Sequence, residues 1–280
     1  MRKQGKGGIE WCDYTWNPVS GCLNSCEYCY ARRIARRFGK INDGYHLALP
    51  PHIKSRRNGE VFELSERLKN PYPFGFRPTL RRYLLDEPRM KKTPSTIFVG
   101  SMCDLFGAWI PFDWVESVLD ACEAAPRHRY MFLIKNIHGY FDFDMPSDFK
   151  NCWYGQSWDG INTALTYYSP NFNRFLSIEP LLRGNLALDT IAEGWFDWVI
   201  VGAETGNRRG KVTPRREWVA SIVTQCWEVG VPVFLKSNLA EVWGGELIQE
   251  FPFKADFNKT RRLQINEFLR RTENTTSKRS

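Results

Sequence analysis

Three cysteines lie within eight residues of the sequence at a spacing that suits an iron–sulfur cluster. Cys22, Cys26 and Cys29 follow the pattern C-x3-C-x2-C, and Tyr28 precedes the last of them. Three thiolates on one short loop can hold three corners of a four-iron cluster, which leaves the fourth iron with an open position. An electron carrier closes all four corners with cysteine, whereas an open iron can bind a substrate or cofactor. The spacing therefore predicts a catalytic [4Fe–4S] cluster on these three cysteines.

A structural zinc ion is the alternative for the same cysteines, with Cys12 as its fourth ligand. Zinc ribbons usually pair two C-x2-C units, but this segment has one such unit and no histidine follows it closely. The spacing therefore favours a cluster over zinc.

The composition predicts a globular protein that works in a reducing compartment. The chain has 280 residues, of which 42% are hydrophobic and 15% aromatic, so one α/β domain can bury a sizeable core. The sequence has no run of about 18 apolar residues, so we expect no membrane-spanning helix. The charged N-terminus is not followed by the apolar segment of a secretory signal. We therefore expect a cytoplasmic protein without membrane partners, whose eight cysteines are thiols or metal ligands rather than disulfides.

The net charge of +8 is concentrated in two places. Residues 258–280 carry seven Lys or Arg against two Glu, and a second cluster directly follows the cysteines: Arg32, Arg33, Arg36, Arg37 and Lys40. A nucleic-acid partner would explain both clusters, and the eleven tryptophans could stack on its bases. A solvated tail and a solvated helix face explain the same charges equally well.

The order of predicted elements is strand, cysteine loop, helix, and then a regular strand–helix alternation. A β-prone segment ends at Pro18, and an apolar stripe with period 3.6 predicts a helix over residues 30–38 that stops at Gly39. Residues 40–94 contain many prolines and read as an irregular insertion or lid, with one modest helix over 61–69. Further strands are expected at 96–100, 129–135, 152–157, 174–179, 196–202 and 231–236, and helices at 112–125, 160–168 and 214–228.

This alternation predicts an α/β fold with a parallel sheet, wound as a barrel or partial barrel of six to eight strands. The barrel would span residues 1–245, and residues 246–280 would form a basic C-terminal extension.

Polar residues just past the predicted strands are candidates for the site, because parallel α/β folds keep their chemistry at the carboxyl ends of strands. They are Ser101, Asp104, Lys135, Ser157, Glu179, Glu204 and Lys236. For Ser101, Asp104 and Ser157 an ordinary turn or cap role is an equal alternative. Glu179, Glu204 and Lys236 place a charge at the end of an apolar strand, which requires a partner or a function.

The cysteine spacing, with Tyr28 before the last cysteine, resembles the signature of the radical S-adenosylmethionine (radical SAM) superfamily. Several blocks along the chain look, in the same order, like a phage and bacterial radical-SAM-like family catalogued as a domain of unknown function. The blocks cover residues 9–18, 26–31, 101–106, 175–182, 198–202 and 233–236. The chain departs from that family in its three-residue spacer between the first two cysteines, where many members have a longer one, and in Ala203, where glycine is usual.

The resemblance implies a partial (βα)6-type, TIM-like barrel with a [4Fe–4S] cluster on Cys22, Cys26 and Cys29 and S-adenosylmethionine on the open iron. Tyr28 would lie near the adenine, Ser101 and Asp104 near the methionine amino group, and Ser157 and Glu179 near its carboxylate or the ribose. Lys135 and Lys236 would hold a phosphate or the methionine carboxylate. Cys103 could return a hydrogen atom to a substrate radical, and Glu204 stays a candidate catalytic residue. The remaining cysteines, such as Cys122 and Cys226, would be small core residues.

The expected function is that of a radical SAM enzyme that forms a 5′-deoxyadenosyl radical and abstracts hydrogen from a nucleic acid or nucleotide. The Ser-x-x-Asp turn at Ser101 and Asp104 also resembles the spore photoproduct lyase branch, which repairs DNA. A flavodoxin or ferredoxin would donate the electron.

Two other functions stay open at this point. One is a non-catalytic nucleic-acid-binding protein in which zinc or a fully ligated cluster only stabilises the cysteine-containing loop. The other is a hydrolase in which Asp104, Glu179 and Glu204 bind magnesium.

Overall fold

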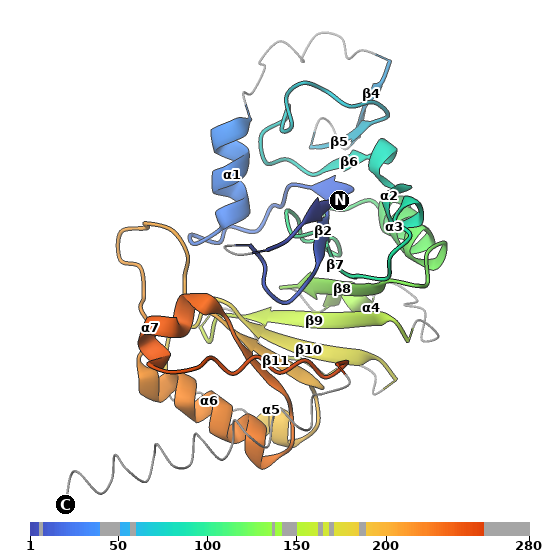
Figure 1. Ribbon diagram of the computed structural model, residues 1–280. Helices are drawn as coiled ribbons and strands as arrows, with labels where there is room; N and C mark the ends of the chain where they lie inside the picture. Colours follow the sequence, from blue (N-terminus) through green and yellow to red (C-terminus); the bar gives the residue numbers. More distant parts are fainter. Residues whose placement is uncertain are drawn as a thin grey trace, which may run out of the picture.

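Seven parallel strands lie side by side in sequence order in the larger sheet of the computed structural model (Figure 1). They are β2 (Tyr14–Trp16), β7 (Thr96–Val99), β8 (Arg129–Ile134), β9 (Cys152–Trp158), β10 (Asn173–Ile178), β11 (Trp198–Val201) and β12 (Val233–Leu235). The short β1 (Arg2–Lys3) pairs antiparallel with β2 at one edge. The structure describes residues 1–5, 8–39, 51–56, 60–135, 138–141, 150–161, 165–167, 171–184 and 189–254. Among them, the hydrogen-bonded order of the larger sheet begins at β1 and ends at β12.

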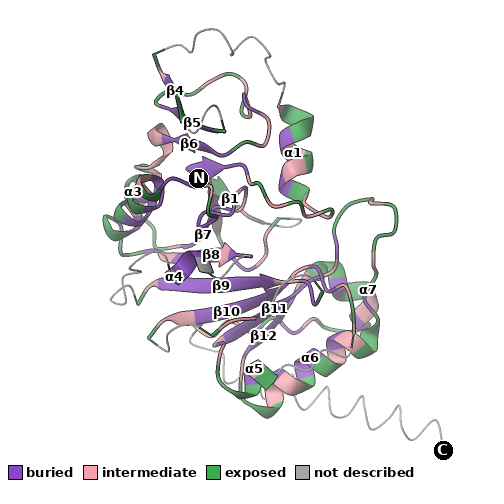
Figure 2. Ribbon diagram, turned by 180° about the vertical axis from the view of Figure 1, so that it is seen from behind, coloured by how far each residue is buried: buried purple, intermediate pink, exposed green. Residues whose placement is uncertain are grey.

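Helices follow β7, β8, β10 and β11 and cover one face of this sheet, leaving their polar sides to solvent (Figure 2). They are α3 (Phe112–Glu123), α4 (His138–Phe141), α5 (Asp189–Ala192) and α6 (Arg216–Glu228); α2 (Glu87–Met90) precedes β7 and α7 (Ala240–Trp243) follows β12. Trp114, Val115 and Val118 of α3 belong to one core cluster with β7, β8 and β9. Val219 and Ile222 of α6 belong to a second cluster with β10, β11 and β12.

Side chains of each strand alternate between the helix-covered face and the opposite, inner face. In β10, Leu176 and Ile178 pack with α5 and α6, whereas Phe175 joins an aromatic cluster on the inner face. Because both faces are covered, these strands are almost continuously apolar, as expected for a parallel sheet.

The inner aromatic cluster explains much of the tryptophan content. Trp11, Trp153 and Trp198 are buried in it, and Phe251 and Phe253 pack against them. None of the eleven tryptophans is exposed. Six of them are buried and five are half-buried, so they pack against the protein rather than offering open faces for base stacking.

The segment over residues 51–94 contains ordered structure that the sequence analysis did not predict. A second sheet has the order β3 (Val19–Ser20), β6 (Thr79–Arg81), β5 (Val61–Leu64), β4 (Ile53–Arg56). The helix expected over residues 61–69 is wrong, because Val61–Leu64 is a strand that is buried on both faces. Phe62 of that strand stacks on Phe74 at a ring-centroid distance of 3.7 Å. Residues 40–50 of the expected insertion lie outside the described residues.

Most other element predictions are confirmed to within a few residues. Helix α1 (Tyr30–Phe38) begins after Cys29 and ends at Gly39. The helix expected over 160–168 is not present at residues 165–167, and residues 162–164 and 168 lie outside the described part. The packed body continues past residue 245, since Leu235 N donates to Ile248 O and the Trp198 indole donates to Glu250 O. No helix in the described ranges combines the length and apolar character needed to cross a membrane.

Candidate functional site

A cavity of about 210 Å³ lies at the carboxyl ends of the parallel strands, between the sheet and the loop that carries the cysteines. The candidate residues predicted from the sequence all line it: Cys22, Cys26, Tyr28, Cys29, Ser101, Cys103, Asp104, Lys135, Ser157, Glu179, Glu204 and Lys236. The structure therefore brings the whole predicted set to one place.

The cysteine loop (residues 21–29) is held in position by the turn that follows β7. Gly21 pairs with Cys103 in a parallel bridge, and its N–H donates to Met102 O at 2.8 Å. Gly21 has a φ of +96°, and a Cβ there would lie 2.2 Å from Arg77 O. Only glycine fits this position, because both the positive φ and the neighbouring Arg77 carbonyl exclude a side chain.

Backbone N–H groups already point at two of the three thiols. Arg32 N donates to Cys29 Sγ at 3.3 Å, so Cys29 caps the N-terminus of α1, and Asn24 N donates to Cys22 Sγ at 3.3 Å. All three thiols are free and half-buried. N–H···S bonds and a helix N-terminus both stabilise negative charge on sulfur, which is the environment that a cysteine-held cluster uses.

Burial keeps two of the loop thiols, Cys22 and Cys26, protonated in the metal-free chain. It raises the pKa of Cys22 to about 12, with the nearby Asp104 carboxylate adding to the effect. Burial also raises the pKa of Cys26, and Lys135 partly offsets that shift. Metal or cluster binding must therefore release protons from this loop. Within the described residues, no three His, Cys, Asp or Glu side chains surround the position of a single ion. A cluster takes each thiolate on a different iron, so it requires that the thiols face one space, which they do.

Asp104 carries an unsatisfied oxygen in the cavity wall. The residue is 4% exposed, and its Oδ2 accepts a hydrogen bond from Asn24 at 2.8 Å. The Lys135 backbone N–H lies near the carboxylate and lowers its pKa, but Oδ1 accepts no hydrogen bond of good geometry from the described residues. A buried carboxylate oxygen without a donor calls for an explanation, and a bound cationic or donor group supplies one. The donor set of the cavity thus fits a cluster on the thiols together with a small cationic molecule beside Asp104.

Replacing Asp104 with asparagine is expected to stabilise the metal-free protein at neutral and alkaline pH but not at pH 4. Burial raises the pKa of Asp104 from 3.8 to about 6. Since the folded pKa lies above the unfolded one, the stability linked to this group is present below pH 4 and is lost as pH rises through 6. Asp104→Asn should therefore raise the free energy of unfolding by up to about 3 kcal/mol at pH 8 and leave it unchanged at pH 4. Urea unfolding at both pH values, with the exposed Asp86→Asn as control, measures this; an equal effect at pH 4 and pH 8 would contradict it.

Tyr28 is tied to the sheet through a hydrogen-bond network that sequence reasoning missed in part. Its hydroxyl donates to Asp159 Oδ2 at 2.7 Å and accepts from Lys135 Nζ at 2.8 Å. Lys135 Nζ also lies 3.4 Å from Ser157 Oγ. Burial and the Asp159 hydrogen bond raise the pKa of Tyr28, so its hydroxyl stays protonated. Asp159 is 1% exposed and directly follows β9, a strand-end position that the sequence analysis could have included.

Mutations of Tyr28 and Asp159 are expected to be non-additive. Tyr28→Phe and Asp159→Ala should each lower the free energy of unfolding by about 1–3 kcal/mol, because each leaves a buried polar partner unpaired. The double variant should then show about the same decrease in the free energy of unfolding as the more damaging single variant, because the two changes remove the same hydrogen bond. Urea unfolding of the three variants gives the coupling energy, and simple additivity would show that the two side chains act independently.

Glu179 and Lys236 form an ion pair across the cavity. Lys236 Nζ lies 2.5 Å from Glu179 Oε2, and the two side chains are 14% and 20% exposed. Burial opposes the charge on Lys236, but Glu179 outweighs it, so the pKa of Lys236 is raised. Glu10, another residue that sequence reasoning missed, accepts hydrogen bonds from Ser237 N and Oγ next to this lysine. The pair is thus held from two directions.

Ser101 and Glu204 are engaged within the protein. Ser101 Oγ hydrogen-bonds Asn17, and its carbonyl accepts from Tyr30 Oη at 2.5 Å. Both oxygens of Glu204 accept from Arg208, at 2.7 and 2.9 Å, and this hydrogen bonding lowers the pKa of Glu204. Glu204 therefore stabilises the conformation of the β11–α6 loop (residues 202–215).

This geometry weighs against the two alternatives from the sequence. Glu179 and Glu204 are paired with Lys236 and Arg208, which disfavours a shared magnesium site with Asp104. Cys12 is absent from the residues that line the cavity and packs in the inner aromatic cluster, which disfavours it as a fourth ligand. Cys122 and Cys226 are buried core residues, as expected.

Comparison with known families gave one match. The model of the family described as "protein of unknown function (DUF5131)" matches residues 6–264. Comparison with curated proteins and with solved structures gave no match. Because the matched segment covers almost the whole chain, this protein belongs to the DUF5131 family.

Proposed function

We propose that this protein is a radical SAM enzyme with a partial (βα)-barrel, which holds a [4Fe–4S] cluster on Cys22, Cys26 and Cys29 and binds S-adenosylmethionine beside it. The observation that carries the proposal is that three free thiols of one loop face a single cavity at the carboxyl ends of a parallel sheet. When bound, the cluster supplies the electron that cleaves S-adenosylmethionine to methionine and a 5′-deoxyadenosyl radical, which takes hydrogen from the substrate.

The polar side chains of the cavity suit the charges of S-adenosylmethionine. Asp104, with its unpaired Oδ1, would bind the positively charged end of the cofactor. Lys236, whose partner Glu179 also lines the cavity, would bind the methionine carboxylate, and Glu179 would then be free to accept from the amino group. Tyr28 is held by Asp159 and Lys135, so its ring can orient a flat adenine.

Apolar side chains make up much of the cavity wall. Ile9, Trp11, Phe76, Phe98 and Leu133 contribute to its wall. Exclusion of water protects reactive species from side reactions, which a radical mechanism needs. These residues bear no functional group that a radical would require, so their role is to keep the site dry.

Iron, acid-labile sulfide and 5′-deoxyadenosine test the proposal. The anaerobically reconstituted protein should contain about four irons per chain and release 5′-deoxyadenosine when it is reduced in the presence of S-adenosylmethionine. A flavodoxin or ferredoxin would replace the chemical reductant in the cell. One zinc and no iron per chain would instead show that the cysteines form a structural zinc site in a non-catalytic protein.

A further inference from the structure

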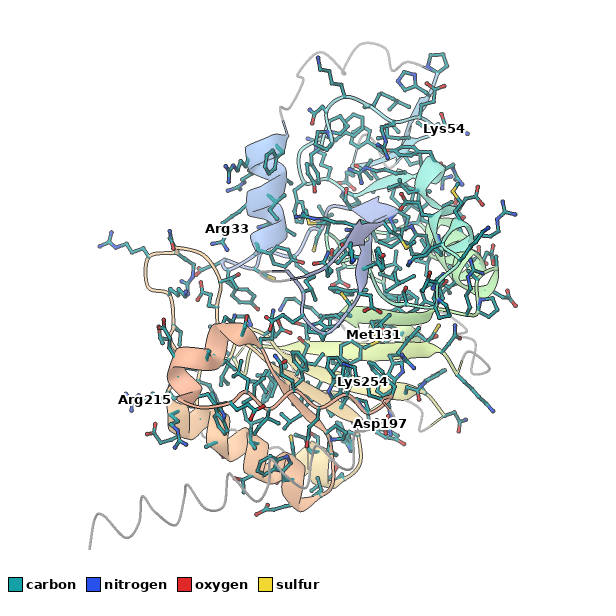
Figure 3. All side chains as sticks on the ribbon, viewed as in Figure 1. Arg33, Lys54, Met131, Asp197, Arg215 and Lys254 are labelled. Carbon is teal, nitrogen blue, oxygen red and sulfur yellow. The ribbon has the colours of Figure 1, made fainter. Side chains whose placement is uncertain are left out.

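Two basic segments that are far apart in the sequence meet at the mouth of the cavity. Arg33 of α1 donates from Nη2 to Thr205 O at 2.9 Å, and Arg208 Nη1 lies 3.5 Å from Glu27 Oε2. Figure 3 shows Arg33 between α1 and the β11–α6 loop. Together the segments form a surface that we call the basic rim: Arg32, Arg33, Arg36, Arg37, Arg208, Arg209 and Lys211.

The chemistry of the basic rim suits phosphate. Six of its seven cations are arginines, and the acidic residues among them are Glu27 and Glu204. Arg36, Arg37 and Arg209 are exposed, and no acidic side chain of the described residues lies within ion-pair distance of them. The planar guanidinium group binds phosphate oxygens in a bidentate manner, so a row of exposed arginines favours a phosphate backbone over a single carboxylate.

An exposed aromatic ring lies within the same surface. Phe38, the last residue of α1, is 56% exposed, and the guanidinium of Arg37 lies 5.4 Å from its ring centroid. Exposed aromatic rings among cations are typical of surfaces that bind single-stranded nucleic acid, where bases stack on the ring. The tryptophans do not offer such a ring, because none of them is exposed.

The basic rim and the cavity share their walls. Tyr30 and Ala31 of α1 and Ala203, Glu204 and Thr205 of the β11–α6 loop line the cavity, and the cations of the rim follow them in each segment. A polynucleotide on the rim would therefore lie next to the opening. A site set into a cavity cannot reach a base inside a duplex, so only an unpaired or flipped nucleotide can enter.

We propose that the basic rim binds single-stranded nucleic acid and presents one unpaired nucleotide to the cavity as the substrate. The assignment of that nucleotide as substrate rests on the proposed radical SAM function, whereas binding of the strand requires no cofactor.

Fluorescence anisotropy with 5′-fluorescein-labelled, 20-nucleotide single-stranded DNA and RNA of mixed sequence tests the binding. If the rim neutralises about four phosphates, affinity should fall roughly 50-fold between 50 and 200 mM salt. The double variant Arg36→Glu/Arg37→Glu should bind at least about tenfold more weakly, with a salt slope smaller by about 1.4. Full-length protein is used throughout, so the basic C-terminal segment contributes equally to every variant, and circular dichroism verifies folding.

The matched control is Arg89→Glu/Lys92→Glu, which reverses the same number of exposed charges before the start of β7, at the opposite end of the sheet from the cavity. It should retain wild-type affinity. Equal affinity of the rim variant and this control would overturn the proposal, as would tighter binding of a duplex of the same sequence. Binding of an acidic ferredoxin that requires the rim, with no binding of the oligonucleotide, would also overturn it and assign the surface to an electron donor.

The two proposals fail separately. Loss of the predicted oligonucleotide binding in a protein that still forms 5′-deoxyadenosine refutes the substrate class alone. Rim-dependent oligonucleotide binding by a protein without iron refutes the radical mechanism alone.

Discussion

Cys26→Ala is expected to reduce the iron content of the reconstituted protein from about four irons per chain to less than one, and 5′-deoxyadenosine formation to the level without enzyme. The reason is that the cysteine loop offers three thiols to the cavity, and Cys103, which also lines the cavity, comes from a different segment. Two thiolates leave two of the four irons without a cysteine ligand, so the cluster readily loses iron. Colorimetric iron and sulfide analysis and chromatographic detection of 5′-deoxyadenosine measure the two effects.

The control for this variant is Cys226→Ala. It also removes one thiol, but from the core cluster beneath α6, away from the cavity. It should keep its full iron content and its activity. Retention of four irons by Cys26→Ala, or equal loss in Cys226→Ala, would contradict the assignment of the loop as the cluster site.

Lys236→Met is expected to lower the free energy of unfolding by about 3–5 kcal/mol, because it leaves the carboxylate of Glu179 largely buried without its cation. The ion pair has an N–O distance of 2.5 Å, and both side chains are at most one-fifth exposed. Because the pKa of Lys236 is raised, the contribution of the pair should be constant through neutral pH and be lost only above the ordinary lysine pKa of 10.5. Urea unfolding at pH 7 and pH 9 should therefore show the same loss.

The double variant Lys236→Met/Glu179→Gln separates stability from binding. It removes both charges, so most of the lost stability should return. It should still fail to bind S-adenosylmethionine in equilibrium dialysis of the reconstituted protein, since both groups proposed to contact the methionine moiety are gone. A double variant that binds the cofactor as the wild type does would show that the pair is purely structural.

The convergence of the site residues could be predicted from the sequence because parallel strands bring their carboxyl ends to one edge. Asp104, Lys135, Glu179 and Lys236 each follow an apolar run, and the structure places all four in one cavity wall. The cysteine loop and α1 could also be predicted from the sequence, because the cysteine spacing and the apolar stripe of the helix are local signals.

The second sheet and the partners of the site residues could not be predicted in the same way. Strand β5 is short and buried on both faces, so it lacks the alternation that marks a strand, and β3 has two residues. Asp159 and Asn24 gain their roles only through contacts with Tyr28 and Asp104, which lie 131 and 80 residues away in the sequence. The meeting of α1 with the β11–α6 loop likewise depends on tertiary packing. The linear charge pattern therefore shows the arginines of α1 but not that Arg208, Arg209 and Lys211 join them.

The most direct test of the central claim is to purify the protein without oxygen, reconstitute it with iron and sulfide, and record absorbance and EPR before and after dithionite. S-adenosylmethionine is then added and 5′-deoxyadenosine is assayed. The account predicts a broad absorbance band at about 400 nm that bleaches on reduction, an EPR signal of a reduced cluster that changes when S-adenosylmethionine binds, and formation of 5′-deoxyadenosine. A colourless protein that holds one zinc ion per chain and forms no 5′-deoxyadenosine would contradict it.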